Sequence, residues 1–330
     1  MKIIVDAFGG DNAPLEILKG CEAAVKSLDI DIILTGREEE IQKVAEENEI
    51  SLERMEIVDA PEVLTMDDHA GAIMKEKSDS SMAEGLRLVA EGKGDAFLSA
   101  GNSGSLVVGA TMIVKRIKGI KRVAFAPMVP NSKGFFMLID SGANVDCRPE
   151  MLLQFGIMGS IYLDKVIGVK NPRVALANVG TEDHKGGDLQ HAAFAMLKDS
   201  KLNFIGNIEA RDISNDGADV VVADGFTGNI ILKMFEGVVT MVMGKFKEVF
   251  TKNTKNKMAT AMLLKDMTAL KKSMDYNEYG GAPVIGAAKP VFKVHGSAKA
   301  RTVESALRLT KAYVEKNVTE EISRAISEQE

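Results

Sequence analysis

Short apolar runs alternate with longer stretches of helical periodicity along nearly the whole chain. The runs are rich in valine and isoleucine without polar alternation, which is typical of parallel strands buried on both faces. Helices between successive strands therefore predict an α/β fold, a mostly parallel sheet covered by helices. The predicted strands are Ile3–Asp6, Asp31–Leu34, Met55–Val58, Ala96–Ser99, Phe136–Ile139, Arg173–Asn178, Asn203–Gly206 and Val220–Asp224.

The helical stretches carry recognisable start signals. The sequence from Ser81 to Glu84 fits a capping box, and Pro14 suits the first turn of a helix. No Pro/Gly/Ser-rich linker divides the chain, so we expect one unit over residues 1–330 whose two lobes share strands. The predicted helices are Leu15–Leu28, Ser81–Glu91, Ser105–Lys115, Pro149–Asp164 and Gly187–Leu197.

Composition narrows the class of protein. The chain has 330 residues, 45% of them hydrophobic, and a net charge of −6, which argues against a dedicated nucleic-acid binder. Cys21 and Cys147 are too few for a disulfide framework, which favours a reducing cytoplasm. Asp6 interrupts the start of the chain, so we expect no secretion signal. No run approaches roughly 18 uninterrupted apolar residues, the length of a membrane span.

Four strand ends share one pattern, in which a strand passes through glycines and small polar residues into a helix. They read VDAFGGDNAP (5–14), LSAGNSGS (98–105), ANVGTEDHKGG (177–187) and ADGFTGN (223–229). Ligands of open parallel sheets bind at the carboxyl ends of strands, and N–H groups at a helix start attract anions. Four such turns predict a composite cleft for phosphate or a phosphate-bearing molecule.

Common site motifs are missing from the sequence. There is no G-x-x-x-x-G-K-[ST] loop, no G-x-G-x-x-G fingerprint and no G-x-S-x-G elbow. The four histidines lack H-E-x-x-H spacing and the cysteines lack C-x-x-C, so we expect neither a metal site nor a cofactor.

Six motifs in order along the chain resemble one family. They are VDAFGGDNAP, SAGNSG, NPRVALANVG followed by KG, GNIEARDI, DVVVADGFTGNIILKMFEG and YGGAPVIGAAKPVFKVHGSAKA. Together they resemble the bacterial phosphate acyltransferases of phospholipid synthesis, from residue 3 to about residue 310. Thr181, Ala210 and Ala298 depart from the family pattern without removing a motif.

The resemblance implies a reaction and a fold. The family transfers a long-chain acyl group from acyl carrier protein to inorganic phosphate, giving acyl phosphate. It also implies a homodimer with the two-lobed fold of the isocitrate/isopropylmalate dehydrogenases and phosphotransacetylases. Phosphate is itself a nucleophile, so direct attack on the thioester needs orientation, which contributes about 7–11 kcal/mol, and an oxyanion donor, which adds about 3–4 kcal/mol.

Four residues are the candidates for catalysis. Lys185 is a candidate cation for phosphate or the leaving thiolate, and Asp224 a candidate proton acceptor, with helix capping as its alternative. Asn229 is a candidate donor to phosphate or to the oxyanion. His295 has the ordinary pKa of a general base, with a structural hydrogen bond as its alternative.

The remaining candidates bind phosphate or substrate through the glycine-rich turns, and turn stabilisation is their structural alternative. Glu209 is also a candidate for an ion pair with Arg211. The set is Asp6, Gly9, Gly10, Ser99, Gly101, Asn102, Ser103, Gly104, Asn207, Glu209, Gly225, Gly228 and Ser297.

Two basic stretches are candidate docking surfaces. Acidic carrier proteins require a local basic site, which residues 115–122 offer through Lys115, Arg116, Lys118, Lys121 and Arg122. The alternative is that these cations follow a helix C-terminus.

The segment Thr251–Met274 carries six lysines and predicts a projecting basic amphipathic helix. Two hypotheses stand for its apolar side: reversible contact with the anionic inner face of the cell membrane, or packing on a second subunit. The membrane-contact candidates are Met262, Leu263, Met267 and Leu270.

Three other functions stay open at this point. A phosphotransacetylase acting on short acyl-CoA differs in its donor, and a hydroxyacid dehydrogenase lacks support because the dinucleotide fingerprint is missing. A non-catalytic phosphate-sensing or membrane scaffold protein would explain the glycine-rich turns without chemistry.

Overall fold

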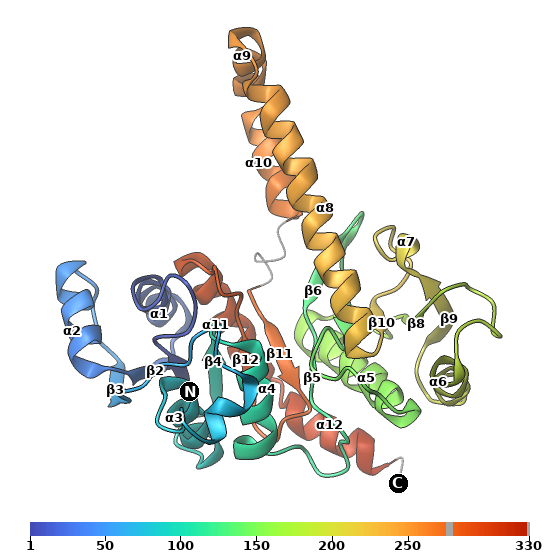
Figure 1. Cartoon of the computed structure of the whole chain (residues 1–330), viewed down its shortest axis with the longest axis horizontal. Helices are drawn as coiled ribbons and strands as arrows, with labels where there is room; N and C mark the ends of the chain where they lie inside the picture. Colours follow the sequence, from blue (N-terminus) through green and yellow to red (C-terminus); the bar gives the residue numbers. More distant parts are fainter. Residues whose placement is uncertain (275–279, 329–330) are drawn as a thin grey trace.

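The computed structural model describes residues 1–274 and 280–328, which form two sheets covered by helices (Figure 1). The first sheet is seven-stranded, in the order β3-β2-β1-β4-β12-β11-β5, and is parallel except for the pairs that β11 makes. Its strands are β1 (Lys2–Asp6), β2 (Asp31–Gly36), β3 (Met55–Asp59), β4 (Ala96–Ser99), β5 (Ala124–Phe125), β11 (Ala282–Ile285) and β12 (Val291–Lys293).

The second sheet is five-stranded, in the order β6-β7-β10-β8-β9, and only the β6–β7 pair is antiparallel. The α/β prediction is therefore confirmed. The strands of this sheet are β6 (Met128–Asn131), β7 (Gly134–Ile139), β8 (Val174–Asn178), β9 (Phe204–Glu209) and β10 (Val220–Val222).

Helices connect the strands in both sheets. The α-helices are α1 (Leu15–Leu28), α2 (Glu38–Glu47), α3 (Ser81–Ala90), α4 (Ser103–Gly109), α5 (Pro149–Tyr162), α6 (Asp188–Lys198), α7 (Ala210–Ile213), α8 (Gly225–Thr251), α9 (Thr254–Met262), α10 (Leu264–Ser273), α11 (Ala300–Glu315) and α12 (Val318–Ser327). A 3₁₀ segment η1 (Ala70–Met74) and π-helical segments η2 (Ala110–Val114) and η3 (Leu163–Ile167) complete them.

The chain leaves the first sheet after β5, builds the second sheet, and returns to insert β12 between β4 and β11. One buried apolar cluster runs through both sheets, from Ile3 and Val5 to Met137 and Val220. The ring of Tyr313 in α11 lies 6.0 Å from that of Tyr162 in α5 and 5.4 Å from that of Phe292 in β12. The two lobes therefore share one hydrophobic core, and the chain also passes from the first sheet to the second and back.

Two local predictions were wrong. The N-cap of α3 is Ser80, whose hydroxyl accepts from the N–H of Ala83, while the hydroxyl of Ser81 donates to Asp6 instead. The segment 251–274 is not a single helix, because it breaks at Leu263 between α9 and α10.

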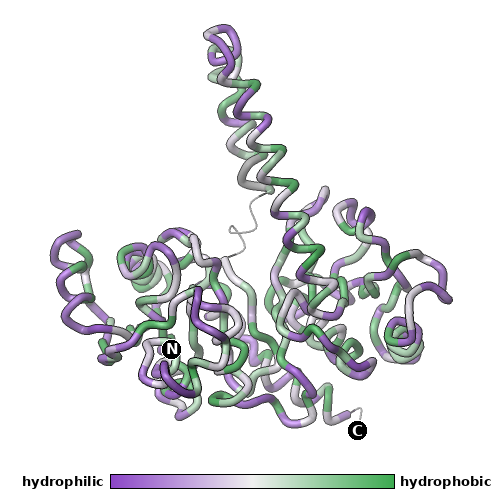
Figure 2. Tube along the Cα trace, in the orientation of Figure 1, coloured by the Kyte–Doolittle hydropathy of each residue, from purple (hydrophilic) through white to green (hydrophobic). Residues whose placement is uncertain are grey.

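A helical arm rises from the body of the protein. It consists of α8 and the shorter α9 and α10 that fold back beside it, and apolar residues run along its length (Figures 1 and 2). By length and composition α8 is apolar enough to cross a membrane, although Lys233 and Glu236 interrupt it, and only 6% of its most apolar window is buried. The first turn of α8 packs closely against the loop after β7, and the rest of the helix extends away from the second sheet and is largely exposed.

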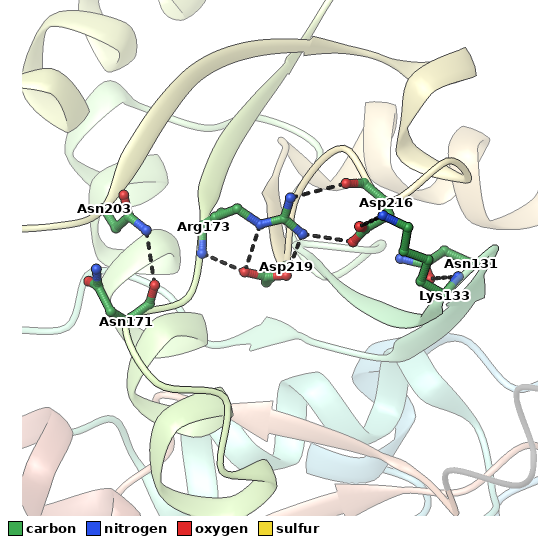
Figure 3. A network of polar contacts seen from close by, with 7 residues as sticks. All are labelled: Asn131, Lys133, Asn171, Arg173, Asn203, Asp216 and Asp219. Atoms are coloured by element: carbon green, nitrogen blue, oxygen red, sulfur yellow. Dashed lines mark hydrogen bonds and ion pairs between the residues drawn. The ribbon is translucent and has the colours of Figure 1, made fainter.

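An ion-pair network closes the opposite end of the second sheet (Figure 3). The guanidinium of Arg173, just before β8, lies 2.7 Å from Asp216 and 2.8 Å from Asp219, just before β10. Lys133, in the β6–β7 turn, lies 3.0 Å from Asp216, and the two cations lower the pKa of that carboxyl. The network joins the amino ends of the strands and leaves their carboxyl ends for the site.

Candidate functional site

A pocket of about 440 Å³ opens between the two sheets. The first sheet contributes residues that follow β1, β4 and β12, and the second contributes the loop after β7 and one side of α8. Its lining comprises Asp11, Met66, Ser103, Phe125, Pro127, Met128, Ser141, Gly142, Asn229, Leu232, Lys233, Glu236, Gly280, Gly281, Ala282, Lys293, His295 and Gly296.

Three of the four glycine-rich strand ends reach this pocket. Asp11 comes from the first, Ser103 from the second and Asn229 from the fourth. The turn 177–187 contributes no lining residue. A composite cleft therefore exists, and it is built from both lobes.

The turn after β1 is held by a buried carboxylate. Asp6 accepts from the hydroxyl of Ser81 at 2.6 Å and from that of Ser99 at 2.7 Å, and burial raises its pKa. Ser99 in turn accepts from the N–H of Gly101 at 3.0 Å. A Cβ on Gly9 would lie 2.6 Å from that same nitrogen, so the two turns need glycine to pack together. Asp6, Gly9, Ser99 and Gly101 thus hold the two turns together, although none of the four lines the pocket.

Lys293 ends β12 beside this network. Its ammonium donates to the carbonyl of Ala100 at 3.0 Å and also to that of Val294, and it lines the pocket. Burial lowers the pKa of Lys293 to about 8, and the charges of Asp6 and Asp11 offset part of that effect. The sequence analysis did not single out this residue.

His295 reaches the pocket two residues later. Its Nδ1 accepts from the N–H of Ser297 at 3.2 Å and lies 2.7 Å from the hydroxyl of Ser297. Burial, and next the charge of Lys293, lowers the pKa of His295 and favours the neutral ring. Because Nδ1 is an acceptor here, the neutral ring carries its proton on Nε2. His295 is therefore set up as a hydrogen-bond donor.

The first turn of α8 packs against the loop after β7. A Cβ on Gly225 would lie 2.5 Å from the carbonyl oxygen of Asn144, and one on Gly228 would lie 1.9 Å from that of Asp140. The side chain of Asn229 sits beside Gly142 at the pocket wall. Gly225 and Gly228 thus allow the close approach that brings Asn229 into the pocket.

Asp224 is the N-cap of α8. One carboxylate oxygen accepts from the N–H of Thr227 and the other from its hydroxyl, both at 2.8 Å. This is the capping alternative considered for Asp224, which does not line the pocket; its role as a proton acceptor stays a prediction.

We predict that Asp224→Ala lowers the stability of the chain by about 1 kcal/mol, because a helix cap is lost. Thermal melting measures the effect, and Asp224→Asn, which keeps an acceptor, should recover most of it. A large fall in turnover for Asp224→Asn with unchanged melting would contradict a purely capping role.

The second turn has its own cap. Asn102 accepts from the N–H of Ser105 at 3.0 Å and donates to three carbonyl oxygens, with Asp68 the nearest at 2.9 Å. These bonds fix the turn structurally and leave Ser103 at the pocket. A Cβ on Gly104 would lie 3.0 Å from the side chain of Ala70, so the turn packs closely on η1.

Two other glycine-turn candidates stand on the first lobe. Gly10 adopts a left-handed φ of 95°, and a Cβ there would lie 2.7 Å from the carbonyl oxygen of Gly296. Ser297 lies behind His295, which does line the pocket. Gly10 thus brings the β1 turn against the residues that follow β12.

Three candidates lie at the far strands of the second sheet, outside the pocket. Lys185 has a side chain 41% exposed and lies 3.9 Å from Glu182. Asn207 donates to the carbonyl of Glu182 at 2.9 Å, while its buried carbonyl oxygen has no partner among the described residues. Glu209 pairs with Arg211 at 2.6 Å, the ion pair considered as its alternative. The structure does not bring these three to Asn229 and His295.

The basic stretch 115–122 forms an exposed loop after η2. The amide of Gln154 accepts from the N–H of Lys121 at 2.8 Å and donates to Gly119 at 3.0 Å, which fixes the loop on α5. All five cations are exposed. Ser103 lies at the other end of α4 and η2, about 18 Å away at 1.5 Å per residue.

The pocket lining contains both polar and apolar side chains. Ser103, Asn229, Lys293 and His295 supply polar atoms, whereas the apolar part of the lining comes from Met66, Phe125, Pro127, Met128 and Leu232. The sequence analysis missed the apolar part of the lining and Asp11, Lys233 and Glu236 as well as Lys293. A lysine and a histidine ending one apolar run, PVFKVHG, were the available signal for Lys293.

The family model described as "Fatty acid synthesis protein" matches residues 1–321. The chain belongs to this family. It is 44% identical to a phosphate acyltransferase of Alkaliphilus oremlandii over 99% of this chain and 98% of the relative. It is 42% identical to a phosphate acyltransferase of Clostridium acetobutylicum over 99% of both chains.

A solved structure supports the fold. A phosphotransacetylase from Streptococcus pyogenes superposes with a TM-score of 0.61 over 95% of this chain and 94% of that chain, at 16% identity. The two-lobed α/β architecture of this family member is therefore shared with phosphotransacetylases.

Proposed function

We propose that the chain transfers a long-chain acyl group from acyl carrier protein to inorganic phosphate, giving acyl phosphate for phospholipid synthesis. The observation that carries the proposal is the 44% identity to a phosphate acyltransferase over 99% of the chain. The pocket supports it, because the polar residues of its lining suit phosphate and the apolar residues suit an acyl chain.

The reaction proceeds by direct attack of phosphate on the thioester carbonyl. A phosphate oxygen forms a bond to the carbonyl carbon, which gives a tetrahedral oxyanion. The C–S bond then breaks as the carbonyl re-forms, and the carrier's thiolate is released. Asn229 and the Nε2–H of His295 are donors for the oxyanion, and one such donor contributes roughly 3–4 kcal/mol. The carrier leaves as a thiolate and takes a proton from water.

The test is thiol release from palmitoyl-acyl-carrier protein with and without inorganic phosphate, with hydroxylamine trapping the product. Phosphate-dependent thiol release with trapped acyl product is the expected result. Thiol release that does not depend on phosphate would contradict the proposal. No thiol release from either palmitoyl-acyl-carrier protein or acetyl-CoA would favour a phosphate-binding or scaffold protein.

A phosphotransacetylase acting on short acyl-CoA is the second candidate, favoured by the fold shared with the Streptococcus pyogenes enzyme. Acetyl-CoA in the same assay discriminates the two. Turnover of acetyl-CoA in place of the long-chain carrier substrate would move the chain to this class.

The exposed loop 115–122 is the proposed landing site for the carrier. Its five cations complement an acidic carrier, although the chain as a whole is acidic. Charge-reversal of Lys118 and Lys121 should raise KM for the carrier substrate at low salt more than at high salt. An equal KM at both salt concentrations would contradict docking at this loop.

We also propose that the arm brings this cytoplasmic enzyme to the inner face of the cell membrane. Its tip exposes four apolar side chains, including Met262 at 87%, on the same segment as the exposed Lys255, Lys257 and Lys265. A basic amphipathic tip suits an anionic bilayer. The apolar side chains are Met258, Met262, Leu263 and Leu264.

We further propose that α8, the long helix of the arm, forms the contact of a homodimer. Along α8, Ile230, Met234, Val238 and Met241 are exposed at helical spacing. An apolar stripe of this length usually packs against another apolar surface, and α8 of a second copy of the chain carries a matching stripe.

We predict that the double substitution Met262→Glu and Leu263→Glu abolishes binding to vesicles that contain anionic lipid, because two charges enter the apolar tip. Co-sedimentation measures the binding, and gel filtration checks that the dimer is intact. Met112→Glu, at an exposed methionine of the body, is the matched control. Vesicle binding that survives the double substitution would exclude the tip as the contact.

A further inference from the structure

Three lysines are candidates for the cation that binds phosphate, and they differ in their solvation. Lys185 lies outside the pocket. Lys233 lines the pocket, but its side chain is 58% exposed and lies 2.8 Å from Glu236. Lys293 lines the pocket and is half-buried, with Ala100 and Val294 as carbonyl partners. A charge shielded from water attracts an anion more strongly than one screened by solvent.

Lys293 belongs to a row of polar residues across three neighbouring strands. In the parallel pairing of β12 with β4, Lys293 lies directly opposite Ser99, whose hydroxyl bonds to Asp6 at the end of β1. The row is extended by Ser81 of α3 on the other oxygen of Asp6. Lys293 therefore lies on the strand next to this hydrogen-bonded row, and the charge of Asp6 favours its protonated form.

The protons of the ammonium can be assigned in part. Two of its three N–H groups point to carbonyl oxygens among the described residues, which hold the head group in place. The third is available to a pocket ligand. An ammonium that is already ordered needs little reorganisation when an anion arrives.

We propose that Lys293 is the residue that binds the phosphate substrate, and that the carbonyl oxygens of Ala100 and Val294 hold its ammonium in place. The proposal rests on the proposed function for the identity of the anion. It assigns Lys293 the role for which the sequence singled out Lys185.

The proposal predicts a specific dependence on pH. The charged and titratable groups around Lys293 are Asp6 at the end of β1, Asp11 in the following turn, Lys233 and Glu236 on α8, and His295 just after β12. With a pKa of about 8, Lys293 loses its proton as the pH rises through that value. Phosphate stays a dianion in this range, so its KM should rise above pH 8.

The experiment titrates phosphate at saturating palmitoyl-acyl-carrier protein from pH 6.5 to 9.5. At pH 7, Lys293→Met should raise KM for phosphate about 10- to 100-fold, since a charged hydrogen bond is lost. Lys293→Arg keeps its charge at high pH, so its KM should stay flat where the wild-type KM rises. Lys43→Met, an exposed lysine of α2 paired with Glu47, is the matched control.

Two results would overturn the proposal: a wild-type KM in Lys293→Met, or the same rise above pH 8 in Lys293→Arg as in the wild type. Thermal melting checks the fold, and if Lys293→Met does not fold, Lys293→Arg alone decides. Calorimetric titration of the protein with inorganic phosphate at pH 7 and 9.5 tests phosphate binding by Lys293 separately from the proposed acyl transfer. Phosphate binding that depends on Lys293 without acyl transfer would contradict only the proposed function.

Discussion

Replacing Gly228 with alanine is expected to displace α8 and destabilise the chain by about 3 kcal/mol, the upper end of overpacking costs. The added Cβ would lie 1.9 Å from the carbonyl oxygen of Asp140, a distance that no van der Waals contact allows. The loop cannot yield cheaply, because the carboxylate of Asp140 accepts from the N–H groups of Phe125, Gly142 and Asn144.

Thermal or urea unfolding measures this effect. Gly237→Ala is a matched control on the same helix, where an added Cβ meets nothing within 4 Å. That control should be neutral or stabilise the chain by up to about 1 kcal/mol, the helix-propensity difference. Equal stabilities of the two variants would show that α8 and the Asp140 loop do not pack as described.

Replacing Asn229 with aspartate is expected to lower kcat/KM about 100- to 1,000-fold, the cost of one oxyanion donor. The change is nearly isosteric, so the side chain still fits beside Gly142. It removes the amide N–H₂ and puts a negative charge where phosphate and the oxyanion need donors. Both effects act on the reaction rather than on the fold.

Steady-state kinetics and thermal melting together test this prediction. Asn215→Asp is the control, because Asn215 is exposed in the loop after α7 and lies outside the pocket lining. A variant Asn229→Asp with normal kcat/KM would remove Asn229 from the site. A lowered kcat/KM accompanied by a matching loss of melting temperature would assign it a structural role.

The regular elements were predictable because their signals are local. Runs such as Val220–Val222 are apolar throughout, and each is followed by a helix with a strong start, so strand and helix could be assigned without knowing the tertiary fold. The short strands β5, β11 and β12 gave no such signal. The pairing of β12 with β4 joins Val291 to Phe97, and that of β11 with β5 joins Val284 to Phe125, contacts between distant residues that local periodicity cannot report.

The site was predictable only in part, for a physical reason. A polar residue between a strand and a helix serves equally well as a cap or as a ligand. Asp224 and Asn102 cap their helices, whereas Asn229, one turn into α8, reaches the pocket. Lys185 resembled a site cation because glycines flank it in the sequence. It follows β8, however, which lies one strand farther from the pocket than β10. Lys293 was missed because its burial comes from the inserted β12.

The insertion of β12 beside β4 also sets when the pocket forms during synthesis. Lys293 and His295 leave the ribosome almost 200 residues after Ser99, at roughly 5–20 residues per second. Until then the apolar β4 has an open edge, a place where strands of other chains can add. A nascent or truncated chain that lacks β12 therefore lacks Lys293 and His295 in the pocket lining, and the edge of β4 is unpaired.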